Sequence, residues 1–311
     1  MWPFSNHKAE ATHLIEGFLP HDVVQLIRSG RCGELSPTPK EATVLFAEIS
    51  DYSNIAQDMT LDELFIFLKD IFGVLEDSVR INRGLVDKFN GDSMMAIWNV
   101  PEDCPSHQYH ACIAALQLQE AIPKIFRKAG IEKVPAVHVG INSGKVVAGV
   151  FQFGSRSNFT AFGDEVNIAS RLVGIAKFFG TPIGVTETVY LATADAIIAR
   201  ELALVRVREN DSPLKIFEIL SRQNQLPMGW DKALPSFQSG LEHWRQKRFK
   251  EAGRAFEDVL QIFPGDGPSQ YYQATSARYL REDFPSDWDG SFNVTSKPTT
   301  IADMIAKAKA P

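Results

Sequence analysis

The feature that most constrains the fold of this chain is the dipeptide Asn90-Gly91, which lies between two short runs of strand-forming residues. The run before it is LVDKF, at 85–89, and the run that follows is DSMMAIW, at 92–98. Asn-Gly between two such runs is the strongest short-range signal of a β-hairpin, because both residues tolerate the positive φ angles of a tight turn. Residues 85–98 are therefore predicted to form two antiparallel strands joined by that turn.

Around this hairpin, residues 39–224 alternate between strand-like and helix-like patterns. Thr60 followed by Glu63 is a capping-box pattern at the start of a helix. The dipeptide Ser143-Gly144 is predicted to join two further strands. The expected order is a strand at 42–49, a helix from Thr60, the hairpin, a helix at about 106–128, strands at 134–142 and 145–153, a helix from Asp164 and a closing strand at 214–220. This mixture predicts an α+β fold, in which helices back a sheet.

Two smaller segments flank this domain. Residues 1–38 are predicted to be a helical segment and a linker, with an apolar stripe made of Ile15, Phe18, Leu19, Val23, Val24 and Ile27. Residues 225–311 are predicted to be a small all-α tail, with helices at 233–247, 249–263 and 268–282. Part of a tetratricopeptide pattern is matched by Gly240, Ala252, Phe256 and Pro264. One such unit cannot bury its own apolar face, so the tail is expected to lean on the 39–224 domain or on a second copy, with a protein partner left open.

Composition excludes several classes of protein. The chain of 311 residues has a formal net charge of −6, and its pI is about 5.7, so a nucleic-acid partner is not expected. No uncharged apolar run approaches the roughly 20 residues of a membrane helix, and the first residues do not resemble a signal peptide. The three cysteines are too few for a disulfide framework. A cytoplasmic location without membrane association is expected.

Two carboxylates are the first candidates for chemistry. Glu48 ends the strand at 42–49, and Asp92 directly follows the Asn-Gly dipeptide. If these strands are neighbours, the carboxylates converge at one end of the sheet, where they can hold Mg²⁺ or Mn²⁺ together with substrate phosphates. Two such ions can assist an in-line phosphoryl displacement. The alternative for either residue alone is an ordinary acid at a strand edge or turn.

Three further polar residues are candidates for binding a nucleotide. Lys88 precedes Asp92 by four residues, and its alternative interpretation is a solvated lysine on a half-exposed strand. Asn167 and Arg171 are four residues apart in DEVNIASRL, which places them on one face of a helix. An amide and a guanidinium suit a ribose or a phosphate. The alternative is an exposed polar helix face, although the residues around these two are largely apolar.

Three segments together carry a specific resemblance. TVLFAEISDYS resembles the first metal-binding strand of the class III adenylate and guanylate cyclases, and VDKFNGDSMMAIW resembles the hairpin with the second metal aspartate of that family. GINSGKVVAGVFQFGSRSNFTAFGDEVNIASRL is similar to its central signature. The resemblance covers about residues 40–220. It implies a cyclase-like fold, a ferredoxin-like sheet backed by helices, with the tail as an all-α extension.

The resemblance also implies a role for individual residues. Glu48 and Asp92 occupy the metal-carboxylate positions, and the carbonyl of Ile49 would lie beside one of two Mg²⁺ or Mn²⁺ ions. The remaining positions would bind the nucleotide: Lys88 and Thr160 the base, Asn167 the ribose, Arg171 the α-phosphate and Arg208 the triphosphate, with Arg206 as its rival. The first metal position is usually Asp, so Glu48 is a departure that displaces the carboxylate by about 1.5 Å, while Mg²⁺ demands near-ideal geometry.

These assignments imply an adenylate cyclase that forms cyclic AMP and pyrophosphate. Adenine offers a donor at N6 and an acceptor at N1, which Lys88 and Thr160 can match, so ATP is the expected substrate. Family members take the metal ligands from one subunit and the base-reading and Asn/Arg residues from the other, which implies a homodimer with two shared sites. The alternatives are a weak or inactive cyclase-like module that binds nucleotide, because of Glu48, or a cyclase for GTP or a pyrimidine nucleotide.

Overall fold

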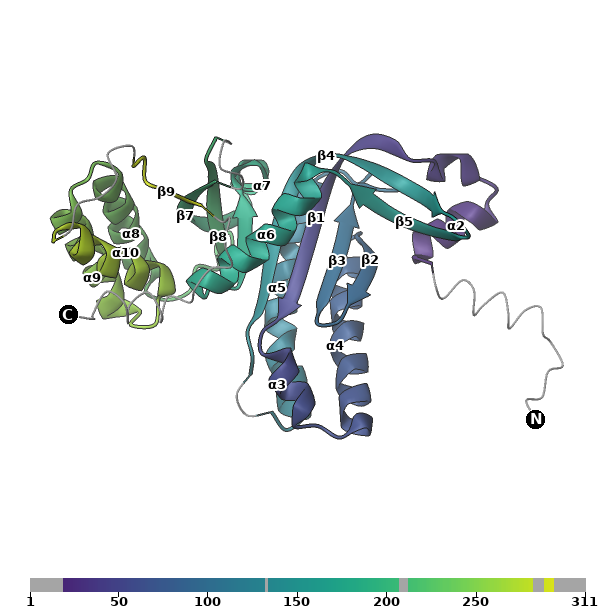
Figure 1. The fold of residues 1–311 in the computed structure, drawn as a ribbon, viewed down its shortest axis with the longest axis horizontal. Coiled ribbons are helices and arrows are strands. Elements are labelled where there is room, and N and C mark those ends of the chain that lie inside the picture. Colours follow the sequence, from purple (N-terminus) through teal and green to yellow (C-terminus); the bar gives the residue numbers. More distant parts are fainter. Residues whose placement is uncertain (1–18, 132–133, 207–211, 282–287, 294–311) are drawn as a thin grey trace.

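The computed structural model describes residues 19–131, 134–206, 212–281 and 288–293. In that part of the chain, nine strands form one sheet with the order β2-β3-β1-β4-β6-β8-β7-β9, and β5 pairs with β4 outside this path. Figure 1 shows this sheet running through the middle of the molecule, with the helical tail at one end. The strands are β1 (Thr38–Ile49), β2 (Leu85–Asn90), β3 (Ser93–Trp98), β4 (Val137–Phe153), β5 (Arg156–Phe162), β6 (Ile183–Thr186), β7 (Ile197–Arg206), β8 (Leu214–Arg222) and β9 (Ser291–Asn293).

The predicted hairpin is confirmed, but its turn is shifted by one residue. β2 and β3 pair antiparallel, and Asn90 lies opposite Ser93 as the last pair of the ladder. The two-residue loop is therefore Gly91-Asp92, with Gly91 at a φ of 60°. Gly91 has a positive φ and Asp92 does not, which is the pattern of the type II′ turn, and that turn favours glycine at its first position.

Helices cover both faces of the sheet. On one face lie α3 (Tyr52–Gln57), α4 (Leu61–Ile81) and α5 (His107–Lys128), whose apolar residues share a core with β1, β3 and β4. The predicted capping box is confirmed, because Thr60 and Glu63 exchange hydrogen bonds at the start of α4. On the other face α6 (Asp164–Phe179) crosses β4 and β1, as Figure 1 shows. α7 (Glu187–Thr193) follows β6 and packs against α5, so it belongs to the first face.

The prediction that two strands meet at Ser143-Gly144 is wrong, because β4 runs unbroken from Val137 to Phe153. Ser143 is buried and donates to the carbonyl of Ala42 in β1 at 3.2 Å. A Cβ at Gly144 would lie 2.8 Å from the side chain of Glu165 in α6. The small residues at this point therefore permit a close helix contact and are not the signal of a turn.

The N-terminal helix differs from the predicted stripe. α2 (His21–Arg28) begins after Pro20, and a 3₁₀ helix, η1 (Cys32–Leu35), follows it. Val23 and Leu26 pack into a core with β2 and β5, whereas Ile27 is 43% exposed. The stripe was therefore wrong at Ile27, because the helix begins only at His21 and turns Leu26 to the core. Ile15 and Phe18 of the predicted stripe lie outside the described residues.

The predicted tail helices are confirmed with small shifts at their ends. They are α8 (Trp230–Arg245), α9 (Phe249–Ile262) and α10 (Gly267–Tyr279). A Cβ at Gly240 would lie 2.8 Å from the ring of Phe256, so glycine allows α8 and α9 to approach closely. The apolar faces of α8, α9 and α10 enclose a separate core. Phe237 and Trp244 of α8 are part of this core.

The tail leans on the sheet, which is the first of the two arrangements expected for it. Arg200 of β7 forms ion pairs with Glu218 of β8 at 2.6 Å and with Asp266, the N-cap of α10, at 2.5 Å. The hydroxyl of Tyr272 in α10 donates to the carbonyl of Leu202 in β7 at 2.8 Å. β9 pairs parallel to β7, so the tail also contributes a strand to the sheet. Among the described helices, none is long and apolar enough to span a bilayer.

Candidate active site

The structure brings together the three residues predicted to hold metal. Glu48 and Ile49 end β1, and Asp92 lies in the loop between β2 and β3. The amide of Ile49 donates to the carbonyl of Asp92 at 3.1 Å, and Glu48 lies opposite Ser93 in the ladder. Both acids are only partly buried. Two acidic residues whose backbones are neighbours at this end of the sheet, together with a backbone carbonyl, offer an all-oxygen donor set, which fits Mg²⁺ or Mn²⁺.

A lysine that the sequence analysis did not consider reaches this corner. Lys177, in the last turn of α6, donates to Oε1 of Glu48 at 3.2 Å. His138 lies opposite Glu48 on β4, and burial lowers its pKa, which leaves it neutral beside this ion pair. Across the described ranges no three His, Cys, Asp or Glu residues gather as a ready metal site. Because Lys177 already pairs with Glu48, a metal ion that binds this carboxylate has to compete with the ammonium group.

The second predicted pair also lies together. Nζ of Lys88, on β2, lies 3.3 Å from Oγ1 of Thr160, on β5, although 72 residues separate them in the chain. The hydroxyl of Thr160 in turn donates to Oδ2 of Asp87 at 2.5 Å, and Lys88 lies 3.4 Å from the same oxygen. Asp87 and Thr160 are each 3% exposed, whereas the side chain of Lys88 is 51% exposed. The three form a polar cluster with one member open to solvent.

A bulge in β2 explains how two neighbouring residues join one cluster. The ladder pairs Val86 with Ala96 but Lys88 with Met95, so Asp87 is the extra residue. In a regular strand consecutive side chains point to opposite faces of the sheet. A bulge breaks this alternation and redirects a side chain. Burial raises the pKa of the Asp87 carboxyl, against which the hydrogen bond from Thr160 and the charge of Lys88 act.

Asn167 and Arg171 both lie on α6, where their four-residue spacing places them on one face as predicted, and both are exposed. α6 lies directly against β4, where a Cβ at Gly140 would come within 2.3 Å of the carbonyl oxygen of Ala169. The amide of Asn142 donates to the carbonyl and carboxylate of Glu165 at 3.0 and 2.6 Å and holds the first turn of the helix. Strand β4 therefore sets the position from which α6 presents both residues.

The predicted triphosphate ligand Arg208 lies outside the described residues. Its rival Arg206 is the last residue of β7 and pairs with Asp289 and with Oγ of Ser291, the latter at 3.1 Å. Those contacts tie Arg206 to the segment that carries β9. In the structure Arg206 therefore serves the attachment of the tail.

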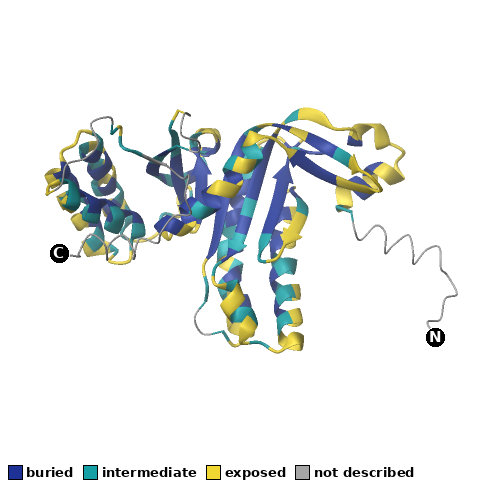
Figure 2. Cartoon of the chain, in the orientation of Figure 1, coloured by how far each residue is buried: buried dark blue, intermediate teal, exposed yellow. Residues whose placement is uncertain are grey.

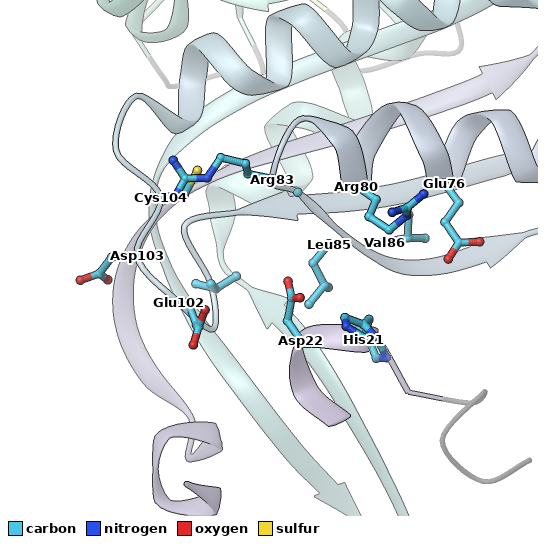
Figure 3. A pocket seen from close by; sticks show the side chains of 13 residues that line it. His21, Asp22, Glu76, Arg80, Arg83, Leu85, Val86, Glu102, Asp103 and Cys104 are labelled. Atoms are coloured by element: carbon cyan, nitrogen blue, oxygen red, sulfur yellow. The ribbon is translucent and has the colours of Figure 1, made fainter. Parts of the chain in front are cut away.

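None of the predicted residues in the described ranges lines either of two cavities found there. One, of about 250 Å³, lies between α2, the end of α4 and the start of β2. Figure 3 shows Arg80 and Arg83 on one side of it and Asp22, Glu102 and Asp103 around the other. The second, of about 290 Å³, lies between α8 and strands β7 and β8. Glu48, Asp92 and Arg171 instead lie toward the surface of a single chain.

Asp87 and Lys177 are the residues of this region that sequence reasoning missed. The alternation rule turns Asp87 away from Lys88, and nothing in the local sequence marks the bulge. Lys177 follows Arg171 by six residues on α6, and its contact with Glu48 depends on how the helix crosses β1. One weak sequence signal marked Asp87: acidic residues are rarely buried without a partner, and Asp87 lies within a strand-like run next to Lys88.

Comparison with known proteins gives one family. Residues 36–212 match the family described as the adenylate and guanylate cyclase catalytic domain. Adenylate cyclase 1 of Rhizobium meliloti (strain 1021) is 29% identical over 219 residues, which cover 69% of this chain and 33% of that protein. The chain therefore spans about a third of the length of this curated relative.

Solved structures agree in fold. The adenylyl cyclase CyaB from P. aeruginosa is similar with a TM-score of 0.56 at 23% identity, covering 62% of this chain and 100% of that one. The guanylate cyclase domain of RhGC from Catenaria anguillulae, in complex with GTP, has a TM-score of 0.52 at 21% identity and covers 60% and 100%. The predicted cyclase-like α+β fold is confirmed. Because adenylyl and guanylate cyclases both match, the fold leaves the purine undecided.

Proposed function

Because this chain belongs to the adenylate and guanylate cyclase catalytic-domain family, we propose that it converts ATP to 3′,5′-cyclic AMP and pyrophosphate. The observation that carries this proposal is the contact of Lys88 with Thr160, at 3.3 Å. An ammonium donates to N1 of adenine, and a threonine oxygen accepts from its N6 amino group. A mismatched base would leave these groups without partners, which discriminates strongly between nucleotides.

The residues around the ends of β1 and α6 supply the rest of the site in this proposal. Glu48 and Asp92, with the carbonyl of Ile49, hold Mg²⁺ or Mn²⁺, two per site. When bound, the ions favour loss of the proton from the ribose 3′-hydroxyl and stabilise the leaving pyrophosphate. Asn167 positions the ribose, and Arg171 stabilises charge on the α-phosphate through its fixed fork of donors. Arg208 completes the contacts to the triphosphate.

The active form in this proposal is a homodimer with two shared sites. Support comes from the exposure of Asn167 and Arg171 on α6 and from an aromatic cluster on the β4–β5 hairpin. Within that cluster Phe153 is 58% and Phe162 49% exposed, and both pack against Phe151. Figure 2 shows exposed residues along this hairpin. Apolar surface of this kind is typical of a protein–protein contact, and here its occupant is a second copy of the chain.

The test is cyclic nucleotide formation by the purified full chain, with all four nucleoside triphosphates and with Mg²⁺ or Mn²⁺. Cyclic AMP from ATP, with GTP and the pyrimidine nucleotides much poorer, is the expected result. Mixing a Lys88→Ala chain with an Asp92→Asn chain, each inactive alone, should restore one of the two shared sites. Absence of every cyclic nucleotide with either metal, at high protein concentration, would refute the enzyme. Dominant GTP or pyrimidine turnover would refute only the choice of substrate.

A second candidate function is favoured by the ion pair between Glu48 and Lys177. An ammonium already seated on a metal-ligand carboxylate, together with Glu in place of the usual Asp, suits a module that binds nucleotide without converting it. Such a module would bind ATP tightly with no turnover, and Glu48→Asp would gain no activity. Turnover by the unaltered chain, or its appearance in Glu48→Asp, contradicts this candidate.

A further inference from the structure

The hydroxyl of Thr160 has its hydrogen-bonding capacity almost fully assigned by its neighbours. A hydroxyl carries one proton and two lone pairs. Lys88, as an ammonium at 3.3 Å, can only donate to it, while the carboxylate of Asp87, at 2.5 Å, can only accept from it. The single proton of Thr160 is therefore directed to Asp87, and one lone pair is taken by Lys88. What remains for a bound molecule is one lone pair, an acceptor.

The carboxylate of Asp87 can sustain this arrangement because its position leaves it few other partners. Its side chain is 3% exposed, so water does not compete for it as it does at the surface. Burial raises the pKa of this carboxyl, while the hydrogen bond from Thr160 and the ammonium of Lys88, 3.4 Å away, favour its ionised form. The bulge at Asp87 brings carboxylate and ammonium to the same hydroxyl, which a regular β2 would not do.

We infer that Asp87 is a specificity-determining positioning residue, which fixes Thr160 as an acceptor and thereby selects a purine with an amino group at position 6. This inference rests on the proposed function, in which Lys88 and Thr160 meet the base. Adenine carries an amino donor at position 6, whereas guanine and hypoxanthine carry a carbonyl acceptor there. Against an acceptor, the oxygen of Thr160 offers no proton. Asp87 makes no contact with the nucleotide in this account and acts through Thr160.

Replacing Asp87 by Ala frees the proton of Thr160, which can then donate to a carbonyl at position 6. ITP is the matched probe, because it carries the same carbonyl as GTP but lacks the 2-amino group. The ratio of kcat/KM for ATP to kcat/KM for ITP is expected to fall about tenfold in Asp87→Ala, which corresponds to about 1.4 kcal/mol, because the freed proton of Thr160 replaces a contact between two acceptors by a hydrogen bond. Asp87→Asn keeps an acceptor oxygen and should retain most of the selectivity.

The ratio separates this role from a structural one, because misfolded protein lowers both rates equally and leaves the ratio unchanged. Thr160→Val is the companion variant: without a hydroxyl, adding Asp87→Ala should change the ratio no further. An unchanged ratio in Asp87→Ala, in a chain whose unaltered form prefers ATP, overturns this inference and leaves the proposed function standing. If the unaltered chain makes no cyclic nucleotide, the proposed enzyme is refuted, and the ratio of dissociation constants for ATP and ITP tests this inference instead. Equal binding of the two nucleotides by the unaltered chain would then overturn this inference as well.

Discussion

Arg200 joins the helical tail to the sheet, and its removal should destabilise the protein sharply. Its guanidinium is 3% exposed and faces two carboxylates, Glu218 at 8% and Asp266 at 6% exposure. It also lies 4.5 Å from the ring centroids of Trp230 and Phe237. Arg200→Met leaves both carboxylates buried without a cation, which typically costs about 3–5 kcal/mol, and the lost cation–π contacts act in the same direction. We expect a loss of about 4 kcal/mol in the free energy of unfolding.

The matched control is Arg80→Met. Arg80 pairs with Asp77 on the surface, where the side chains are 63% and 60% exposed, and pairs as exposed as this contribute little to stability. Urea unfolding followed by tryptophan fluorescence measures both variants, because Trp230 lies next to Arg200. Removing all three charges, with Arg200→Met, Glu218→Gln and Asp266→Asn, should recover most of the loss, since Asn remains a good N-cap. If Arg200→Met is no worse than Arg80→Met, the triad does not anchor the tail.

Three further changes test the corner of the sheet around Glu48. Glu48→Asp should raise kcat with Mg²⁺ by about tenfold or more, and kcat with Mn²⁺ by less, because Mg²⁺ tolerates displaced ligands poorly. Equal gains in kcat with both metals would contradict this. Lys177→Gln removes a cation from Glu48 at a half-exposed site. It should lower the Mn²⁺ concentration for half-maximal activity by up to about fivefold, since such ion pairs contribute at most about 1 kcal/mol. The control, Lys177→Arg, keeps the charge and should behave as the unaltered chain. Acidification should destabilise the fold, because burial lowers the pKa of His107, His110 and His138 below their unfolded value. The unfolded chain then binds more protons than the folded one. The free energy of unfolding therefore falls as the pH drops from about 6.5 through the lowered values. Each histidine adds a slope of at most about 1.4 kcal/mol per pH unit, and thermal melts between pH 7.5 and 5.5 that show no decline would refute it.

Local patterns predicted the parts of the fold that local physics decides. The hairpin, the capping box at Thr60 and the three tail helices followed from turn chemistry and apolar spacing. The meeting of Glu48 with Asp92 followed from one further assumption, that their strands are neighbours, and the ladder of β1 with β3 bears it out. The four-residue spacing also placed Asn167 and Arg171 on one helix face, and the structure shows that both are exposed there.

Contacts between distant segments were harder to predict. The glycine at 144 was interpreted as a turn, but it serves the approach of α6, which only the folded chain reveals. Lys177 meets Glu48 across 129 residues of sequence, and that contact depends on the crossing of a helix over a strand. Asp87 was missed because a bulge in β2 brings its side chain to the same cluster as Lys88, whereas a regular strand would turn the two to opposite faces. Register and helix crossing are set by tertiary packing, so sequence periodicity does not contain them.

The pairing of β9 with β7 has a consequence for solubility. Without β9, Leu204, Val205 and Arg206 at the end of β7 would lose their strand partner and would offer a template for strands of other molecules, a common route to aggregation. The tail shields this side of the sheet twice, with a short strand and with the helices seated on β7. A shortened chain that ends at Arg222 would keep every residue of the proposed metal and base sites, yet it would expose this edge of the sheet. The isolated catalytic segment is then expected to aggregate, which would prevent its activity from being measured.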